Sequence, residues 1–170
     1  MTDPVLLSRD GEVAVVTLNE PERRNALSLN MREVLFEILD EAMASDARAI
    51  VLAGAGGNFC SGGDIKSFDP GAPLVEIRDR LNRLHRVARI LLTGKKPVIA
   101  AVDGYAFGAG VSLALACDHV VAAKDSRFCA SFNRVALMGD LGLLYTLPLR
   151  VGMGKARELM MLGEIVRSEE

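Results

Sequence analysis

The sequence has few of the residues that metal centres require. Its 170 residues include two histidines, His85 and His119, and neither stands in a cluster of ligands, so no metal site is expected. Its three cysteines, Cys60, Cys117 and Cys129, have no CxxC spacing and lie among apolar or small residues. This context indicates reduced, buried thiols rather than ligands or disulfides.

Long apolar runs and an excess of charge of one sign are also absent. The apolar runs are too short to span a membrane, and the first residues lack the basic and apolar regions of a signal peptide. The formal net charge is −2 with scattered Lys and Arg, so neither a membrane nor a nucleic acid is expected as a partner, and the protein is expected to be cytoplasmic. One helical segment is rich in arginine, which indicates a solvated face, with a functional face as the alternative: Arg78, Arg80, Arg83, Arg86 and Arg89.

Apolar runs that alternate with helical periodicities predict a single α/β domain over residues 1–170 with largely parallel strand pairing. Helices are expected at about 31–44, 74–93, 111–116, 142–151 and 155–162, and strands at 5–7, 13–18, 49–53, 97–102, 119–123 and 127–130. The first two strands are expected to form a hairpin through Asp10 and Gly11. Asn30 followed by Glu33 predicts a capping box at the first helix, and Gly152 and Gly154 are expected to separate the last two helices.

Two glycine-rich loops, residues 58–65 and 104–112, each follow a short apolar run and precede an expected helix start. Such turns leave backbone N–H groups free, and two of them aimed at one point form an oxyanion hole, which stabilises negative charge on a carbonyl oxygen. Neither loop has the GxGxxG pattern of dinucleotide-binding proteins or the GxxxxGK[ST] pattern of a P-loop. The alternative is that the glycines only allow a helix and a strand to pack closely.

Three segments of the sequence together resemble the crotonase family, also called the enoyl-CoA hydratase/isomerase family. They are residues 15–28 with Asn-Glu-Pro-Glu-Arg-Arg-Asn-Ala-Leu, residues 59–65 with Phe-Cys-Ser-Gly-Gly-Asp-Ile, and residues 102–110 with Val-Asp-Gly-Tyr-Ala-Phe-Gly-Ala-Gly. The resemblance extends over essentially the whole chain. It implies a spiral of ββα repeats that binds acyl-CoA thioesters and stabilises a thioester enolate, with CoA as part of the substrate and no separate cofactor.

By this resemblance, the backbone N–H groups of Gly63 and Ala109 are the oxyanion donors. The residues expected to contact the CoA part are Arg24, Ala26, Leu27, Ser61, Asp64 and Ile65, of which Asp64 and Ile65 begin a short helix. Arg24 is expected to meet a CoA phosphate. A solvated loop arginine is an equally good interpretation of Arg24.

Hydratases of this family use two glutamates to activate water, and here Ser112 and Phe132 occupy the corresponding positions. Neither side chain replaces an acid or base. Asp140 instead resembles the aspartate of an isomerase-type branch, in which it moves a proton from one carbon to another. Apolar neighbours such as Leu141 are expected to raise its pKa. The alternative is that Asp140 caps the helix that follows.

The expected function is therefore double-bond migration in an enoyl-CoA, with hydratase-like altered chemistry or a catalytically weak acyl-CoA-binding module as alternatives. A serine hydrolase is disfavoured because no GxSxG elbow surrounds Ser61 or Ser112. Leu141 and Leu143 stand where the branch has smaller residues, so the acyl group is not identified. The C-terminal helical part typical of the family is expected to be missing, and a homotrimer or hexamer is expected if those helices exist.

Overall fold

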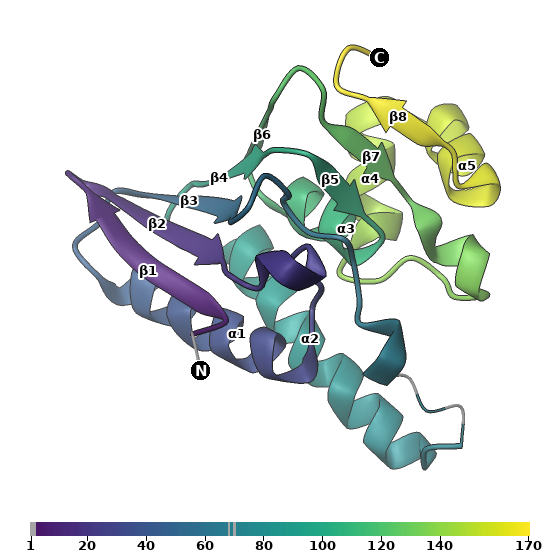
Figure 1. Ribbon diagram of the computed structural model, residues 1–170, viewed down its shortest axis with the longest axis horizontal. Coiled ribbons are helices and arrows are strands. Elements are labelled where there is room, and N and C mark those ends of the chain that lie inside the picture. Colours follow the sequence, from purple (N-terminus) through teal and green to yellow (C-terminus); the bar gives the residue numbers. More distant parts are fainter. Residues whose placement is uncertain (1–2, 68, 70) are drawn as a thin grey trace.

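The computed structural model describes residues 3–67, 69 and 71–170 (Figure 1). The strands are β1 Val5–Asp10, β2 Val13–Leu18, β3 Ala49–Gly54, β4 Val98–Val102, β5 Tyr105–Phe107, β6 His119–Ala122, β7 Arg127–Cys129 and β8 Ile165–Arg167. The helices are α1 Leu29–Ala44, α2 Leu74–Thr93, α3 Ala109–Ala116, α4 Leu143–Val151 and α5 Met153–Leu162. The α/β class predicted from the sequence is confirmed.

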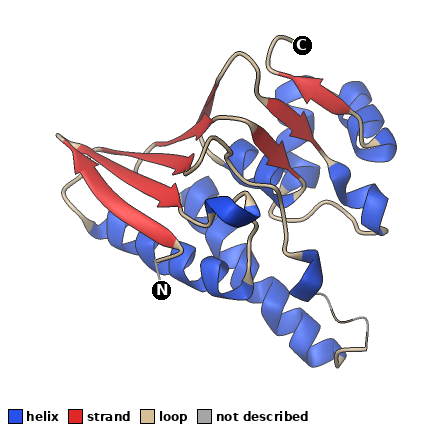
Figure 2. Ribbon diagram, viewed as in Figure 1, coloured by secondary structure: helices blue, strands red, loops and turns tan. Residues whose placement is uncertain are grey.

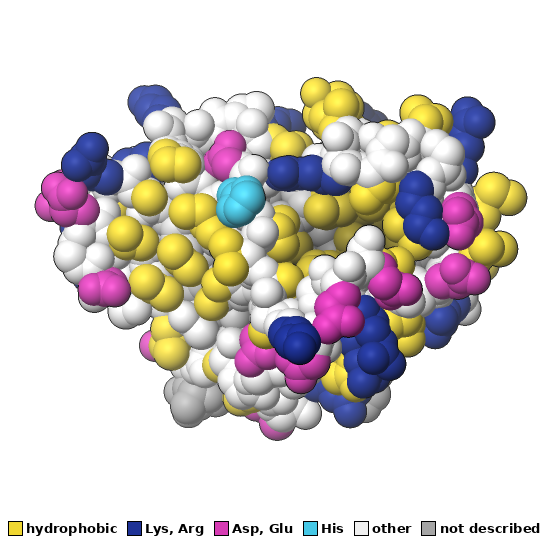
Figure 3. Space-filling view, turned by 90° about the horizontal axis from the view of Figure 1, so that it is seen from above, with side chains coloured by type: hydrophobic (Ala, Val, Ile, Leu, Met, Phe, Trp, Pro, Cys, Tyr) yellow, Lys and Arg dark blue, Asp and Glu magenta, His cyan; other side chains and the backbone are white. Residues whose placement is uncertain are grey.

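The larger sheet has the strand order β1-β2-β3-β4-β6. The β1–β2 hairpin is antiparallel, as predicted, with Val5 opposite Leu18 and a turn through Gly11 at φ 55°. The other three pairings are parallel. Alternate residues of β2 are buried in the core, and α1 and α2 cover one face of this sheet (Figure 2). The opposite face leaves apolar side chains at the surface (Figure 3), among them Leu6 and Val121.

A second, smaller layer makes the chain a spiral. Strands β5, β7 and β8 form a three-stranded sheet, and single bridges Leu27–Gly63 and Cys60–Ala106 continue its parallel pairing toward the N-terminus. After each parallel strand of the large sheet, the chain therefore contributes a short segment to this second layer. Three of these segments lead into α1, α2 and α3, which is the expected succession of ββα repeats.

Several predicted boundaries were wrong. Helix α1 begins at Leu29, because the hydroxyl of Ser28, and not Asn30, accepts a hydrogen bond from the N–H of Met31. Gly154 lies inside α5, and Gly152 alone separates α4 from α5. The three-residue strands β5 and β8 were missed because they are too short for a periodic pattern and exist only through their pairing with β7.

Part of the arginine-rich face of α2 packs against α1. Arg86 donates to Glu33 of α1 at 2.8 Å and lies over the ring of Phe36, while Arg83 is 3.6 Å from the same Glu33. These contacts join α1 to α2. No helix among the described residues is both long and apolar enough to cross a membrane.

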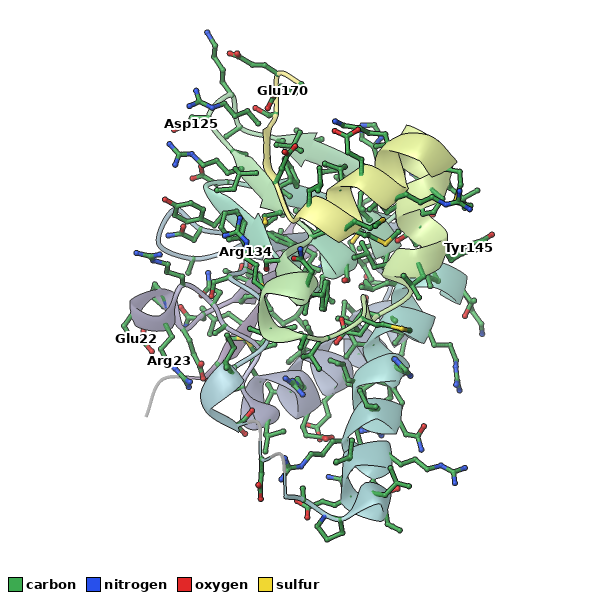
Figure 4. The ribbon with its side chains drawn as sticks, turned by 90° about the vertical axis from the view of Figure 1, so that its right-hand side faces the viewer. Glu22, Arg23, Asp125, Arg134, Tyr145 and Glu170 are labelled. Carbon is green, nitrogen blue, oxygen red and sulfur yellow. The ribbon has the colours of Figure 1, made fainter. Side chains whose placement is uncertain are left out.

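The end of the last helix is fixed to the middle of the chain by side-chain hydrogen bonds to backbone carbonyls. Arg134 donates to the carbonyl of Gly163 at 2.7 Å, and Asn133 donates to that of Met161 at 2.8 Å. Arg134 projects from the 3-10 helix Ser131–Val135, beside β8 and α5 (Figure 4). The segment that leads to Asp140 is therefore held at its beginning by α5.

Candidate active site

The two glycine loops meet in space. A methyl group placed on Gly62 would lie 2.8 Å from the carbonyl oxygen of Phe107 and 3.6 Å from the amide nitrogen of Ala109. A methyl group on Gly110 would collide with the carbonyl of Cys60. Backbone therefore approaches backbone at this point, and a side chain at either glycine would push the loops apart.

The amides of Gly63 and Ala109 remain available at this junction. Ala109 is the first residue of α3, where an N–H has no partner within the helix. In the described part of the chain, neither amide donates to a backbone carbonyl or a side chain. Gly108 precedes α3 with φ 51° and ψ −120°, a conformation that favours glycine, and so aims the start of the helix at the other loop.

The loop of residues 20–28 is bound to the first glycine loop. Arg23 forms an ion pair with Asp64 at 2.7 Å, and Leu27 donates its N–H to the carbonyl of Gly62 at 2.8 Å. The amide of Ser61 donates to the carbonyl of Arg24 at 2.9 Å. Four residues expected near CoA, Arg24, Leu27, Ser61 and Asp64, thus belong to one pair of bonded loops.

Asn25 holds this loop from inside, and the sequence argument gave it no role. It is fully buried; its Nδ2 donates to the carbonyls of Ala55 and Asn58 at 2.9 and 2.7 Å, and its Oδ1 accepts from the N–H of Glu20 at 2.9 Å. An Asn between Arg-Arg and Ala-Leu in a polar loop was the available signal, because a short amide side chain can satisfy several backbone groups at once.

A cleft of about 300 Å³ opens where the loops converge. Gly63, Ala109 and Asp140 all line it, together with Ser61, Asp64 and Ile65. Its apolar wall comes from α1, α2 and the segment after β7: Leu29, Ile77, Leu81, Leu84, Phe132, Val135 and Leu137. The sequence-predicted donors and carboxylate therefore share one cavity, whereas Arg24, Ala26 and Leu27 lie outside its lining.

The Asp140 carboxyl is in an unusual environment. Its Oδ1 is buried and has no hydrogen-bond partner among the described residues, and burial raises its pKa against the opposing charges of Arg32 and His85. Next to it, Leu141 is buried with a left-handed φ of 49°, a conformation that side chains of this kind rarely adopt. Such a carboxyl can hold or release a proton closer to neutrality than an exposed one.

Asp140 does not cap α4 with its side chain. The helix begins at Leu143 after Gly142, and the cap position has no side-chain hydrogen bond. Only the backbone carbonyl of Asp140 takes part, by accepting from the N–H of Leu143 at 2.9 Å. The capping interpretation of this carboxylate was therefore wrong.

The two positions without glutamate differ in their surroundings. Ser112 is fully buried in α3, with its hydroxyl 3.4 Å from the Gly108 carbonyl, and it does not line the cleft. Phe132 lines the cleft and contributes to its apolar wall. Ile65 begins a short 3-10 helix, Ile65–Ser67, and Asp64 directly precedes it, close to the predicted short helix.

Arg32 is a charged residue of the cleft lining to which the sequence analysis assigned no role. It stands in the first turn of α1 and lines the cleft; its Nε donates to the carbonyl of Leu27 at 3.0 Å. Burial lowers its pKa, opposed by the charges of Asp140 and Asp64. The helical periodicity alone placed Arg32 only on the polar side of α1.

Known proteins match this chain over almost its whole length. The family model for enoyl-CoA hydratase/isomerase matches residues 8–170. A probable enoyl-CoA hydratase of Rhodobacter capsulatus is 40% identical over 159 residues, which are 93% of this chain and 61% of that protein. The 1,2-epoxyphenylacetyl-CoA isomerase of Escherichia coli is 35% identical over an alignment of 174 positions, which covers 100% of this chain and 66% of the relative.

Solved structures agree with these relatives. A putative enoyl-CoA hydratase from Streptomyces coelicolor superposes with a TM-score of 0.92 at 40% identity, over 98% of this chain and 62% of that one. A putative enoyl-CoA hydratase from Thermobifida fusca, solved in complex with acetoacetyl-CoA, gives 0.89 at 29% identity, over 99% and 69%. The chain thus spans about three fifths to two thirds of the proteins it matches. The match of the family model and the shared spiral of ββα repeats show that this chain belongs to the enoyl-CoA hydratase/isomerase family, the crotonases.

Proposed function

We propose that this protein processes acyl-CoA thioesters through an enolate and that its reaction is the migration of a double bond in an enoyl-CoA. One observation supports this most directly. A single cleft joins the backbone amides of Gly63 and Ala109, which have no acceptor among the described residues, to the carboxyl of Asp140, whose Oδ1 is buried. Electrostatic stabilisation and proton transfer are the two requirements of such an isomerisation.

The amides of Gly63 and Ala109 are proposed to bind the thioester oxygen. When a proton leaves the carbon chain, negative charge collects on this oxygen, and N–H donors held in place by the fold stabilise it without rearranging. One such donor contributes on the order of 3 kcal/mol to stabilisation of a transition state. Because the donors are backbone groups, the alanine at position 109 is no obstacle to this role.

Asp140 is proposed to move the proton. Its carboxylate takes a proton from one carbon of the chain and leaves an enolate; the resulting carboxylic acid then returns the proton to a carbon two positions away, so that the double bond shifts and the aspartate is regenerated. The raised pKa of the Asp140 carboxyl supports this role, because a stronger base takes a proton from carbon more readily. The neighbouring apolar wall keeps water away from the enolate.

Hydration is the competing reaction, and most of the relatives described above are named as hydratases. It requires side chains that position and activate water. Ser112 is buried against its own helix and Phe132 is apolar, so neither position supplies such a group. Asp64 also lines the cleft but is paired with Arg23, so Asp140 is the carboxyl that we propose for proton transfer between carbons.

The bonded loops are proposed to bind the CoA portion. Arg24 is exposed, has no ion-pair partner in the described part of the chain, and lies 5.4 Å from the centre of the Tyr105 ring. A guanidinium at such a rim suits a phosphate group of CoA. Asp64, in contrast, is paired with Arg23 and is proposed to position the loop rather than to touch the nucleotide.

The test compares two reactions in the full 170-residue chain. Conversion of 3-hexenoyl-CoA to 2-hexenoyl-CoA and hydration of 2-hexenoyl-CoA are followed by chromatography of the CoA esters. We expect isomerisation to be the faster reaction, and Asp140→Asn to lower its kcat by about 100-fold or more. The control is Asp103→Asn, an exposed aspartate next to the second loop that does not line the cleft. Faster hydration than isomerisation, or an Asp140→Asn variant with unchanged kcat, would contradict the proposal.

A further inference from the structure

Arg32 has no part in the proposed reaction, yet it stands in the middle of the site. It is half-buried, and its Nε is engaged by the Leu27 carbonyl at 3.0 Å, which fixes the plane of the guanidinium. Its Nη2 lies 3.6 Å from the position that a methyl group on Gly63 would occupy. The free end of the guanidinium is therefore held beside the loop that carries one of the proposed oxyanion donors.

The guanidinium of Arg32 has no carboxylate partner among the described residues. The neighbouring arginines are paired: Arg23 with Asp64 at 2.7 Å, Arg80 with Glu76 at 2.5 Å, and Arg86 with Glu33 at 2.8 Å. Asp140 acts on Arg32 through its charge, but the two groups do not form an ion pair. Arg32 is thus a partly buried cation that lines a cavity and forms no ion pair within the described part of the chain.

The rest of the cleft defines what a ligand would have to supply. Its wall is largely apolar, so a hydrocarbon acyl chain would fit the wall but would cover the guanidinium and leave it unpaired, which is unfavourable. An acyl chain that ends in a carboxylate would satisfy both parts of the cleft. With Nε occupied, the two Nη groups still present an end-on fork that matches the two oxygens of a carboxylate.

We propose that Arg32 is a specificity-determining residue that selects acyl-CoA substrates whose acyl group bears a terminal carboxylate. The inference rests on the proposed function in one respect, namely that the cleft holds the acyl part of a CoA thioester. It goes further by naming the class of acyl group, the dicarboxylic acids, and the residue that recognises it.

The experiment measures binding, so that it does not depend on turnover. Calorimetry compares pairs of CoA thioesters that differ only at the end of the acyl chain: butyryl- with succinyl-CoA, valeryl- with glutaryl-CoA, and hexanoyl- with adipyl-CoA. The variants are Arg32→Gln, Arg32→Lys and the control Arg89→Gln, which removes an exposed arginine outside the cleft lining. Far-ultraviolet circular dichroism and thermal unfolding establish that each variant is folded.

We expect the wild-type chain to prefer the dicarboxylic member of at least one pair. Arg32→Gln should weaken binding of that member about ten-fold or more and change its partner less than about two-fold. Arg32→Lys should retain part of the preference, and Arg89→Gln all of it. An equal loss for both members would show that Arg32 only supports the cleft and would overturn this inference alone. Failure of the wild-type chain to bind any of the six thioesters would overturn the acyl-CoA function as well.

Discussion

Asn25 offers the most direct test of how the loop of residues 20–28 is held, and the perturbation is Asn25→Ala. The side chain is fully buried and makes three hydrogen bonds, to the carbonyls of Ala55 and Asn58 and from the N–H of Glu20. Each such bond contributes about 1 kcal/mol to the free energy of unfolding. The residue also has φ 54°, where alanine is less favourable than asparagine, which adds up to about 1 kcal/mol.

The expected loss in the free energy of unfolding is therefore about 3–4 kcal/mol. For a domain of this size, such a loss lowers Tm by roughly 10 °C. Urea unfolding followed by circular dichroism at 25 °C measures the free energy, and calorimetry measures Tm. Asn30→Ala is the matched control, because Asn30 is exposed on α1 and its side chain does not cap the helix; its effect should stay within about 0.5 kcal/mol.

A second substitution at the same position, Asn25→Asp, tests whether the hydrogen bonds donated by the Asn25 amide stabilise the loop. Asn25→Asp keeps the shape and the acceptor but turns both donors into carboxylate oxygen, which would face two backbone carbonyls. We expect Asn25→Asp to be less stable than Asn25→Ala at neutral pH, although aspartate is the closer match in volume. A loss below about 1 kcal/mol for the alanine variant, or a more stable aspartate variant, would refute this account of the loop.

Four further predictions concern other parts of the fold. Ser28→Ala should lower the free energy of unfolding by about 1 kcal/mol in urea titrations, because it removes the cap of α1; no change would mean that the helix is capped otherwise. Gly110→Ala should destabilise by about 1–3 kcal/mol despite its helical position, because the added methyl collides with the carbonyl of Cys60; a more stable variant would contradict this close approach. Asp140→Asn should stabilise the protein at neutral pH but not at pH 3. The pKa of this carboxyl in the folded protein is raised above 3.8, so its ionisation lowers the free energy of unfolding as the pH rises past that value. A stability difference between the variant and the wild type that does not change with pH would contradict the raised pKa. Burial raises the pKa of the Cys60 and Cys117 thiols to about 12. A disulfide reagent at pH 8 should therefore label these two cysteines only after the protein unfolds. Rapid labelling of either thiol in the native protein would contradict their burial.

Much of the architecture was predictable from local pattern. Residues 13–18, 49–53 and 97–102 are apolar and rich in β-branched side chains, and α1 and α2 show clear helical periodicity, so the alternation of strands and helices and their parallel pairing followed. The three segments resembling the crotonase family indicated the family, and the match over residues 8–170 confirms it. The positions of Gly63, Ala109 and Asp140 along the chain also followed from that resemblance, and their chemical roles stay predictions.

The sequence by itself thus determined the longer helices and strands, the two glycine loops and the position of Asp140, because these depend on neighbours along the chain. The tertiary structure decided the contacts between residues that are distant in the sequence. Strands β5 and β8 exist through pairing with β7. Asn25 joins residues 20, 55 and 58, and Arg32 lines the same cleft as Asp140, far from it in the sequence. The physical reason is common to all three. Burial and charge at a site depend on groups that are distant in sequence, and only folding brings them within reach of one another.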